Sequence, residues 1–576
     1  MKSRTIIATL VISFLAFASA RASERPLQTR ALWAGPEAFA TAKATDVLIE
    51  RCQRAALNLI LADVMVYQTI SFKSDHFHGR IAASDSFDPL AYLSQRCRAA
   101  GIKLQAWCCV YYEGIRDPSK GPLHPEWAVR SLLGQPFDKN FISPAHPQVN
   151  AYLLSVLNDL LAYDIDGIHL DYIRYPGSAF DYSDAARRAC KRELGFDPQD
   201  LLDHPERIVP PELETFPVRV LCPTSHVAKV WETTAIERTL DQAGLGHAFV
   251  SESPENIRPL RAPGLLILSS YYEVPDSMAR ALEDFVRRGG SLLWTDLPGK
   301  ALANSVALQQ LTGVASSRWL GERKVTLHPV GQHPLAAQLH AKSFRTDAAS
   351  QPVLRGAQIL ATNSDGTPMV LLNEVGTGRV ITLAFHLMRS TSPEVAALAR
   401  RLTTWCATAA GRTATNPLAA KRAAWVAWRG ERVTQLVRDL SAAAKAKHPA
   451  RVVSSSAGPS PFEFYASYRD AARWLAEGIN DEVFPMNYTA QPEVLAELLE
   501  LQSASAPAGT HGRIYPGLQL YAPRPLPGRK EMGPADAAII ERQLRIVREL
   551  GYRGFCLFAY NYLTDEIIDV VRRYGE

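Results

Sequence analysis

Short apolar runs alternate with amphipathic stretches along the first third of the chain. Four of the apolar runs have the length of buried strands: residues 30–35, 58–67, 103–112 and 167–173. Helical spacing of apolar positions occupies the segments between them, at residues 46–57, 88–100 and 148–163. Strands that alternate with helices, without hairpin signals, build parallel sheets through right-handed crossovers. The pattern therefore predicts four strand–helix units by residue 174.

A second α/β pattern fills the middle of the chain. Strands are predicted at residues 218–222, 246–250, 265–269 and 289–295, and helices at residues 227–243 and 276–288. Residues 371–384 read as a hairpin with glycines at its turn. A stretch of roughly 200 residues has the size of one domain. We predict a flavodoxin-like domain over residues 215–410.

The first pattern returns after this segment. A helix is predicted at residues 422–446, and strands follow at residues 451–456, 482–488, 513–521 and 554–560. Further helices are predicted at residues 468–477, 492–502, 535–550 and 564–574. Four strands before the interruption and four after it make the eight of a TIM barrel. We predict one (β/α)8 barrel, split after strand four, with halves at residues 27–205 and 420–576.

The N-terminus has the pattern of an export signal. Basic residues precede an apolar run over residues 5–18, and small residues suit cleavage near Ala20 or Ala22. No second apolar span long enough for a membrane follows. A signal peptide at residues 1–22 predicts a periplasmic or secreted protein without a transmembrane segment.

Charge and cysteine usage exclude several classes of protein. The net charge is +5, and three basic residues lie in residues 1–22, so removing that segment leaves +2. This value is too small to favour nucleic acid or an anionic membrane as partner. The eight cysteines show no metal-ligand spacing, and the adjacent Cys108 and Cys109 point to opposite faces of a strand. We expect free thiols, no metal site and no organic cofactor.

The strand at residues 167–173 carries the most informative polar residues. Alternation places His169 and Asp171 on one face, and in a barrel that face points inward, with Asp171 at the carboxyl-terminal rim where such barrels react. Asp171 is either a catalytic carboxylate or a capping or salt-bridged residue beside Arg174. His169 either adjusts Asp171 or is an ordinary core histidine. Arg174 either holds an anionic group or pairs with Asp171.

Aromatic and amide side chains recur at the ends of the predicted barrel strands. Apolar ring faces edged by hydrogen-bonding groups suit sugar rings, although tyrosine and tryptophan also occur at ordinary core boundaries. We interpret them as a carbohydrate-binding rim. The candidates are Trp33, Tyr111, Tyr112, Tyr172, Asn487, Tyr488, Gln519, Tyr521, Tyr560 and Asn561.

Residues 166–176, with the sequence DGIHLDYIRYP, resemble the glycosyl hydrolase-like family 10 (DUF187) proteins. Residues 142–149 (ISPAHPQV), 30–33 (RALW), 425–429 (WVAWR) and 468–485 add to the resemblance. It implies a TIM barrel in exported bacterial proteins, with members that act on peptidoglycan glycan strands, particularly strands stripped of stem peptides.

The middle segment separately resembles class I glutamine amidotransferase-like domains, at residues 285–294 (FVRRGGSLLW) and 378–386 (GRVITLAFH). The family's nucleophile position departs from the pattern, because residues 270–273 read SYYE without a cysteine, and His386 has no thiol partner. We expect a non-catalytic domain serving as a lid, a second glycan-contact surface or an oligomerisation module. The same arrangement occurs in β-galactosidases. An amidotransferase-type hydrolase is disfavoured by the missing thiol.

Glycoside hydrolysis normally uses two carboxyl groups, about 5–5.5 Å apart for retention and about 6.5–9.5 Å for inversion. Glu113, just beyond the third strand, is the predicted partner of Asp171. Asp63, inside the second strand, is expected to be a buried group near the site, and Glu463 is a further alternative. Strands six to eight end without an acid, so a substrate acetamido group could replace one carboxylate. We predict an exported glycoside hydrolase for cell-wall or related amino-sugar polysaccharide; the alternative is a glycan-binding protein on a degenerate barrel.

Overall fold

The chain forms two compact units in a computed structural model that describes residues 27–575 with internal gaps. The gaps are residues 115–120, 138–139, 203, 205–206, 209–217, 223–230, 252, 261, 270–273, 296–298, 341–342, 388–392, 410–417, 460–466 and 527–528. The predicted signal peptide, Glu463 and residues 270–273, where the amidotransferase-like family has its nucleophile, therefore lie outside the described residues. One unit is a barrel made of Met1–Val129, Asp138–Pro176 and Arg429–Glu576. The other contains Arg130–Phe137 and Gly177–Trp428.

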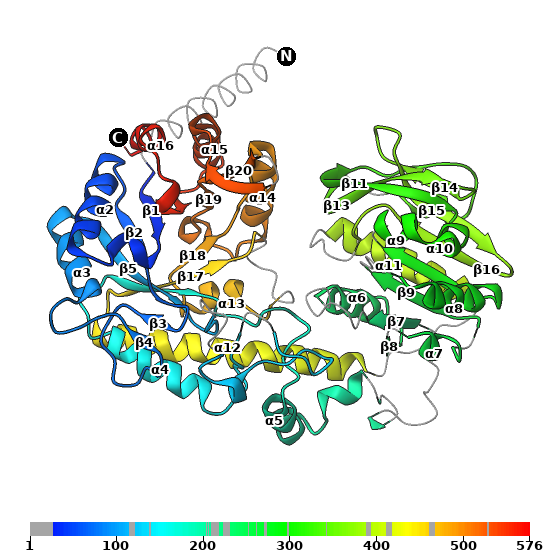
Figure 1. Ribbon diagram of the computed structural model, residues 1–576, viewed down its shortest axis with the longest axis horizontal. Coiled ribbons are helices and arrows are strands. Elements are labelled where there is room, and N and C mark those ends of the chain that lie inside the picture. The colour runs from blue at the N-terminus through cyan, green and yellow to red at the C-terminus, as the bar shows by residue number, and fades with distance from the viewer. Residues whose placement is uncertain are drawn as a thin grey trace, which may run out of the picture. The chain divides into compact units, whose positions relative to one another are not determined.

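The barrel unit is built on eight parallel strands. They are β1 (Thr29–Ala34), β2 (Leu59–Val66), β5 (Lys103–Cys109), β6 (Gly167–Asp171), β17 (Val452–Ala457), β18 (Glu482–Pro485), β19 (Gly517–Gln519) and β22 (Gly554–Phe558). Their order is β18-β17-β6-β5-β2-β1-β22-β19, and isolated parallel bridges join the two end strands, so the barrel is nearly closed. The first and last strands lie side by side, as Figure 1 shows. The predicted (β/α)8 barrel, split after its fourth strand, is confirmed.

Helices lie between the strands of this unit along the chain. They are α2 (Ala42–Arg54), α3 (Pro89–Ala100), α4 (Val149–Leu160), α12 (Ala419–Lys447), α13 (Ala471–Glu477), α14 (Pro492–Ser505), α15 (Ala537–Glu549) and α16 (Asp565–Arg572). The predicted limits of α3 follow from its caps. The Asp88 side chain accepts a hydrogen bond from the Ala91 N–H, and Gly101 ends the helix with φ 67°. Helix α12 begins in the other unit, and its residues from Arg429 belong to the barrel.

Two short features were not predicted. The first lacks the usual turn residues, whereas the dipeptide Pro527-Gly528 between the strands of the second is a turn signal. Strand β3 (Thr69–Ile70) turns back antiparallel to β2, and β4 (Arg80–Ile81) pairs with β3. Tyr67 and Gln68 make this turn with φ 49° and 57°, values that normally indicate glycine or asparagine. Strands β20 (Tyr521–Leu526) and β21 (Arg529–Pro534) form an antiparallel pair after β19. The expectation of alternating strands and helices without hairpins was therefore wrong at these places.

The barrel interior is filled mainly by aromatic side chains. Trp33, Trp107 and Phe484 are buried there, and Tyr515 and Cys556 complete the cluster lower in the barrel. The size of Trp33 explains a glycine on a neighbouring strand. A Cβ atom at Gly517 would lie 2.9 Å from the Trp33 ring and 2.8 Å from the Pro485 carbonyl oxygen. Side chains, rather than a channel, therefore occupy the centre of the barrel.

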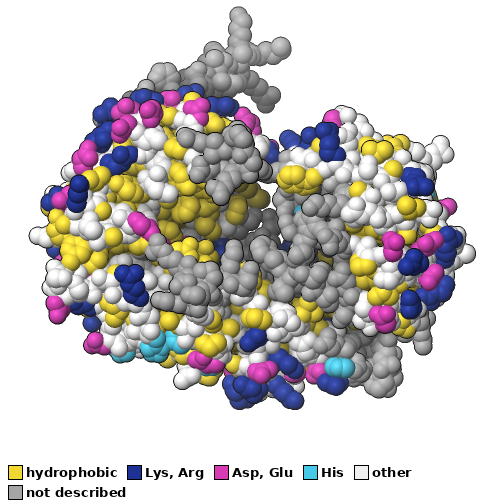
Figure 2. Space-filling view, in the orientation of Figure 1, with side chains coloured by type: hydrophobic (Ala, Val, Ile, Leu, Met, Phe, Trp, Pro, Cys, Tyr) yellow, Lys and Arg dark blue, Asp and Glu magenta, His cyan; other side chains and the backbone are white. Residues whose placement is uncertain are grey.

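Charged side chains of both signs are interspersed over the face of the molecule shown in Figure 2. Hydrophobic side chains gather instead in a hollow on the barrel unit. In the described part of the chain, no helix combines the length and apolar character needed to cross a bilayer. The seven cysteines whose side chains are described are all buried and free.

The second unit contains an eight-stranded mixed sheet. Five parallel strands are β7 (Val218–Cys222), β8 (His247–Ser251), β9 (Leu265–Ser269), β10 (Ser291–Thr295) and β16 (Gly378–Leu383). Their spatial order, β8-β7-β9-β10-β16, is the 2-1-3-4-5 order of flavodoxin-like folds, which confirms the predicted fold of the insert. The sheet continues through antiparallel strands β15 (Pro368–Val375), β14 (Gln358–Thr362) and β12 (His328–Pro329).

The other strands and the helices of this unit lie between or beside the sheet strands along the chain. Strands β11 (Val314–Val325) and β13 (Phe344–Leu354) form a separate antiparallel pair. The helices are α5 (Asp184–Leu194), α6 (Trp231–Gln242), α7 (Pro254–Ile257), α8 (Asp276–Arg287), α9 (Gly299–Asn304), α10 (Val306–Thr312) and α11 (Pro393–Ala409).

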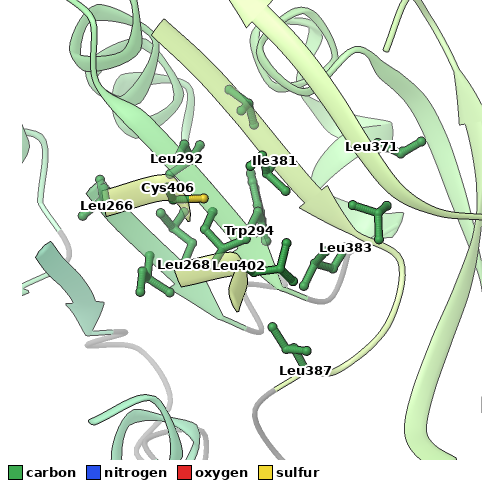
Figure 3. Packing of buried hydrophobic residues seen from close by; sticks show 14 of the residues in the cluster. Leu266, Leu268, Leu292, Trp294, Leu371, Ile381, Leu383, Leu387, Leu402 and Cys406 are labelled. Atoms are coloured by element: carbon green, nitrogen blue, oxygen red, sulfur yellow. The ribbon is translucent and has the colours of Figure 1, made fainter. Parts of the chain in front are cut away.

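One face of the inserted sheet is sealed by helix α11. Strand alternation puts Leu268, Trp294 and Leu383 on the same face, and Leu402 and Cys406 of α11 pack against it, as Figure 3 shows. All five side chains are fully buried. This core belongs to the second unit alone, so the insert has its own hydrophobic centre.

Candidate active site

Asp171 ends strand β6 at the carboxyl-terminal rim of the barrel and is 7% exposed. Three donors converge on its carboxylate. The Trp107 Nε1–H donates to Oδ2 at 3.2 Å, the Tyr172 backbone N–H donates to Oδ1 at 2.7 Å, and the Ser456 hydroxyl also donates to Oδ1. Donors aimed at a carboxylate stabilise its ionised form and hold its orientation. Asp171 is thus a fixed anion at the end of a barrel strand.

Asp63 of strand β2 is a second carboxyl group close to Asp171, in the opposite kind of environment. It is 5% exposed, and its Oδ1 has no hydrogen-bond partner within the described parts of the chain. Burial raises the pKa of Asp63 well above its usual value, and the charge of Asp171 raises it further, while a backbone hydrogen bond from Met65 opposes the rise. Asp63 therefore retains its proton to a higher pH than an ordinary carboxyl group.

Strand register explains how the two carboxyl groups come together. Asp63 lies opposite Trp107 of β5, and Trp107 lies opposite His169 of β6. Asp171 is the next inward residue after His169, so the indole of Trp107 lies between the two acids and bonds to one of them. Acid–base catalysis uses two neighbouring carboxyl groups whose surroundings give them different pKa values.

Half-buried aromatic rings surround this pair. Tyr112 stacks on Tyr172 with ring centroids 4.5 Å apart, and Tyr488 stacks on Phe558 at 4.9 Å. Tyr521 meets the Tyr488 ring edge-on at 6.3 Å. Burial raises the pKa of Tyr488, and the negative charge of Asp171 contributes to the rise. These rings can present faces to a sugar, and Tyr112, Tyr172, Tyr488 and Phe558 pack against the buried cluster of the barrel.

Several predicted rim residues lie elsewhere. The Tyr111 hydroxyl donates to Asn150 Oδ1 at 2.8 Å on helix α4, away from the barrel interior. Asn487 is buried and accepts from Gln502 Nε2 at 2.6 Å. Tyr560 faces the Arg51 guanidinium at 6.0 Å, and Asn561 is exposed. Gln519 is buried, and its Nε2 donates to the Tyr521 carbonyl oxygen at 2.9 Å.

His169 and Trp33 form a polar network one layer below Asp171. The Trp33 Nε1–H donates to His169 Nε2 at 3.2 Å, so His169 Nδ1 carries the proton and donates to Ser454 Oγ at 2.8 Å. The Ser454 hydroxyl donates to Gln105 Oε1 at 2.5 Å, and Gln105 Nε2 donates to Glu482 Oε2 at 3.0 Å. Both ring nitrogens of His169 are thus satisfied inside the barrel, which fits a neutral core histidine.

This network predicts a specific loss of stability in acid. Burial lowers the pKa of His169 to about 4, from the 6.5 of a histidine in the unfolded chain. The unfolded state therefore binds the proton first, and stability falls as the pH drops from 6.5 towards 4. Because one pKa unit corresponds to about 1.4 kcal/mol, this difference amounts to about 3 kcal/mol. In urea unfolding at a series of pH values, His169→Gln is expected to lack this fall in unfolding free energy. The exposed control His448→Gln is expected to show it. If the unfolding free energy of wild type and both variants depends on pH in the same way, His169 is not the residue responsible.

Glu113 lies in a cluster of its own after strand β5. Its Oε1 contacts His124 Nδ1, and its Oε2 accepts from Asn140 Nδ2 at 2.6 Å. His124 continues to His78 at 2.7 Å and stacks on Trp127 with centroids 3.7 Å apart. Glu113 also lines a cavity of about 20 Å³, room for roughly one water molecule. Both carboxylate oxygens of Glu113 thus have partners from the region that follows β5. The acid whose pKa is affected by the charge of Asp171 is Asp63.

Glu113→Gln is accordingly expected to act mainly on stability. The amide loses the charged contact with His124, and a buried hydrogen bond of this kind is worth about 1–3 kcal/mol. We expect lower unfolding free energy in urea with hydrolysis retained within a few-fold. Glu126→Gln, an exposed change in the same segment, provides the control. A large loss of hydrolysis at unchanged stability would instead identify Glu113 as the second catalytic carboxylate.

Sequence reasoning missed four residues of this site. Trp107 and Ser456 bind Asp171, Phe558 stacks on Tyr488, and Arg469 lies in the electrostatic neighbourhood of Asp171 and Arg174. Alternation along β5 and the pairing of β17 with β6 are signals that could have indicated Trp107 and Ser456. Arg469 follows a turn before α13, where no periodic pattern reports direction. The described residues contain no group of three metal-ligating side chains.

Comparison with known proteins finds a family model that matches part of the chain. The model of the family described as Glycosyl hydrolase-like 10 matches residues 405–526. No curated protein matches the chain. Similar solved structures include the beta-galactosidase of Bacillus circulans sp. alkalophilus, with 12% identity over 68% of this chain and 90% of that chain and a TM-score of 0.27.

Two other glycosidases show similarity of the same level. The exo-beta-1,4-mannosidase Op5Man5 of Opitutaceae bacterium strain TAV5 has 13% identity over 69% of this chain and 95% of that chain, with a TM-score of 0.24. Alpha-L-fucosidase isoenzyme 2 of Paenibacillus thiaminolyticus has 12% identity over 67% of this chain and 84% of that chain, with a TM-score of 0.24. Similarity this weak assigns no residue a role.

Proposed function

We propose that the barrel unit is a glycoside hydrolase that cleaves glycosidic bonds in cell-wall or related amino-sugar polysaccharide. The observation that carries the proposal is a pair of carboxyl groups, Asp171 at the carboxyl-terminal end of β6 and Asp63 inside β2. Three donors hold the Asp171 carboxylate in place, and burial raises the pKa of Asp63 well above its usual value. Glycoside hydrolysis needs one carboxylic acid and one carboxylate, and these environments supply one of each.

In this proposal Asp63 protonates the leaving oxygen, and Asp171 acts as nucleophile or base on the other side of the bond. Trp107 and Ser456 keep Asp171 oriented, since each donates a hydrogen bond to it. Tyr172 and Tyr488 offer ring faces to the sugars, which carry apolar C–H faces of their own. These residues need neither metal nor organic cofactor for such acid–base chemistry.

The substrate class rests on similarity together with the predicted export signal. The match to Glycosyl hydrolase-like 10 and the motif at residues 166–176 favour peptidoglycan strands freed of their peptides. Such strands lie outside the cytoplasm, where a protein with the predicted signal peptide is delivered. We propose a periplasmic or secreted location and a non-catalytic role for the amidotransferase-like insert.

A glycan-binding protein on a degenerate barrel is the second candidate. The observation that favours it is burial: Asp63 is 5% exposed and Asp171 is 7% exposed, so neither acid is open to solvent. In that case the acids would stabilise the barrel mouth, and the aromatic rings would bind the glycan without cleaving it.

Incubation of the purified chain, without residues 1–22, with isolated peptide-free glycan strands separates the two candidates. Release of short oligosaccharides, followed by mass spectrometry, supports the hydrolase. Binding of the strands without release supports the binding protein. If the chain neither releases oligosaccharides nor binds the strands, this substrate class is excluded.

A further inference from the structure

Arg469 is a buried guanidinium whose position is fixed from both sides. The preceding Tyr468 is fully buried, has φ 58° and packs edge-on against Tyr175 at 5.6 Å. The Ser467 carbonyl oxygen accepts from the Tyr175 N–H at 3.1 Å. On the other side, Asp470 caps helix α13 by accepting from the Arg473 N–H at 3.1 Å. The backbone at Arg469 is therefore held in place.

The guanidinium of Arg469 is not fully paired within the described part of the chain. Arg469 is 7% exposed, and its Nη1 makes no hydrogen bond with any described residue. Its Nη2 lies close to Gly458, where an added Cβ atom would be 3.5 Å away. A buried guanidinium with five donors normally finds acceptors, because leaving them unpaired is costly. Arg469 thus has a fixed backbone, and no described residue offers an acceptor to its Nη1.

Arg174 brings a second guanidinium to the same place. It donates to the Tyr175 carbonyl oxygen at 3.2 Å, and it lies over the rings of Tyr172 at 5.1 Å and Phe141 at 5.7 Å. Burial and then the positive charge of Arg174 lower the pKa of Arg469 to about 9, against the opposing charge of Asp171. Both arginines remain charged at neutral pH.

The local charges do not balance. No hydrogen bond or ion pair joins Arg174 or Arg469 to Asp171, whose oxygens are bonded to Trp107, Tyr172 and Ser456. Among the described residues, both guanidinium groups have the carboxylate of Asp171 as their nearby negative charge, and burial disfavours the charged form of Asp63. A buried excess of positive charge favours an anion supplied from outside.

We propose that Arg174 and Arg469 form a carboxylate-binding subsite, so that the barrel recognises an acidic glycan. This inference rests on the proposed function of the same site. Arginine suits the role because its planar fork binds a carboxylate through two hydrogen bonds. The carboxylate sits on the sugar itself, either as the lactyl ether of an amino sugar or as the C6 acid of a uronic sugar.

Matched ligands test this subsite in the full chain without residues 1–22. The probes are peptide-free peptidoglycan strands, the same strands with their carboxyl groups reduced to alcohols, and a polyuronide of similar length. Wild type is expected to bind the acidic strands at least about tenfold more tightly than the reduced strands in calorimetry. Arg469→Gln is expected to lower the affinity for acidic strands to that for reduced strands. Arg545→Gln, an exposed change on α15, is the control and keeps the preference.

Arg469→Lys is the second variant, to be used if Arg469→Gln does not fold. Arg469→Lys keeps the charge without the planar fork, and it is expected to retain part of the preference for acidic strands. Tighter binding of peptidoglycan strands than of the polyuronide identifies the lactyl acid, and the reverse identifies a uronic acid. Equal affinity of wild type for acidic and reduced strands would overturn the subsite.

The outcomes also separate this inference from the proposed hydrolase. Preferential binding of acidic strands without cleavage supports the subsite and overturns the hydrolase. Cleavage of acidic and reduced strands at equal rates, unchanged in Arg469→Gln, supports the hydrolase and overturns the subsite.

Discussion

Replacing Asp171 with asparagine is expected to lower the rate of glycan hydrolysis by about 10²–10⁴-fold, the typical contribution of a catalytic acid or base. Asparagine has the same shape, and its oxygen can still accept from Ser456 and from the Tyr172 N–H. It cannot attack as a nucleophile or take a proton as a base. Release of oligosaccharides from peptide-free strands, quantified by mass spectrometry, measures the change.

Asp166→Asn is the matched control for this variant. Asp166 comes just before the same strand at its other end, where its carboxylate accepts from the Leu104 N–H at 2.8 Å. The control should keep wild-type hydrolysis. If Asp171→Asn and wild type release product at equal rates, while both are folded by circular dichroism, Asp171 is a structural residue.

Asp63→Asn is expected to abolish most hydrolysis and, unlike the change at Asp171, to raise stability at neutral pH. The loss of a general acid again corresponds to about 10²–10⁴-fold in rate. The stability change follows from linkage. The pKa of Asp63 is raised well above 3.8 in the folded state, so between 3.8 and the raised value the folded protein binds more protons than the unfolded chain. Unfolding free energy therefore falls as the pH rises through that range.

Urea unfolding at a series of pH values measures this second effect. Wild type should lose stability as the pH rises, whereas Asp63→Asn should lack that part of the slope because asparagine does not titrate. The control Asp166→Asn should follow wild type. A variant that is inactive but has the wild-type pH dependence would show that Asp63 is not the buried, protonated acid.

The barrel could be predicted from sequence because its signals are local. The alternation of Gly167, His169 and Asp171 fixed which side chains point inward, and strand β6 lies where the pattern indicated. Capping residues such as Asp88 and Gly101 gave the limits of helix α3. Eight strands in two groups of four, with an α/β segment between them, left the split barrel as the simplest topology.

The composition of the site could not be predicted in the same way, because it depends on residues far apart in the chain. Ser456 meets Asp171 across a sequence separation of 285 residues, through the pairing of β17 with β6. Asp63 was recognisable as a buried acid, but its pKa is raised by burial and then by the charge of Asp171 in another strand. Glu113 stood at a strand end like a rim residue, yet His124 and Asn140 bind it within its own loop region. The pattern predicted a helix from residue 468, but α13 begins at Ala471, so periodicity did not indicate the direction of the Arg469 side chain.

The order of the strands along the chain also determines when the barrel can be completed during synthesis. Strand β6 ends at Asp171, and its neighbour β17 begins at Val452, about 280 residues later. At ~5–20 residues per second the ribosome needs roughly 15–55 s to make that stretch. Throughout this interval β6 is an open edge with unpaired backbone groups, the kind of edge that promotes aggregation. The inserted sheet, whose strands all lie between Val218 and Leu383, can be complete while the barrel is still half made.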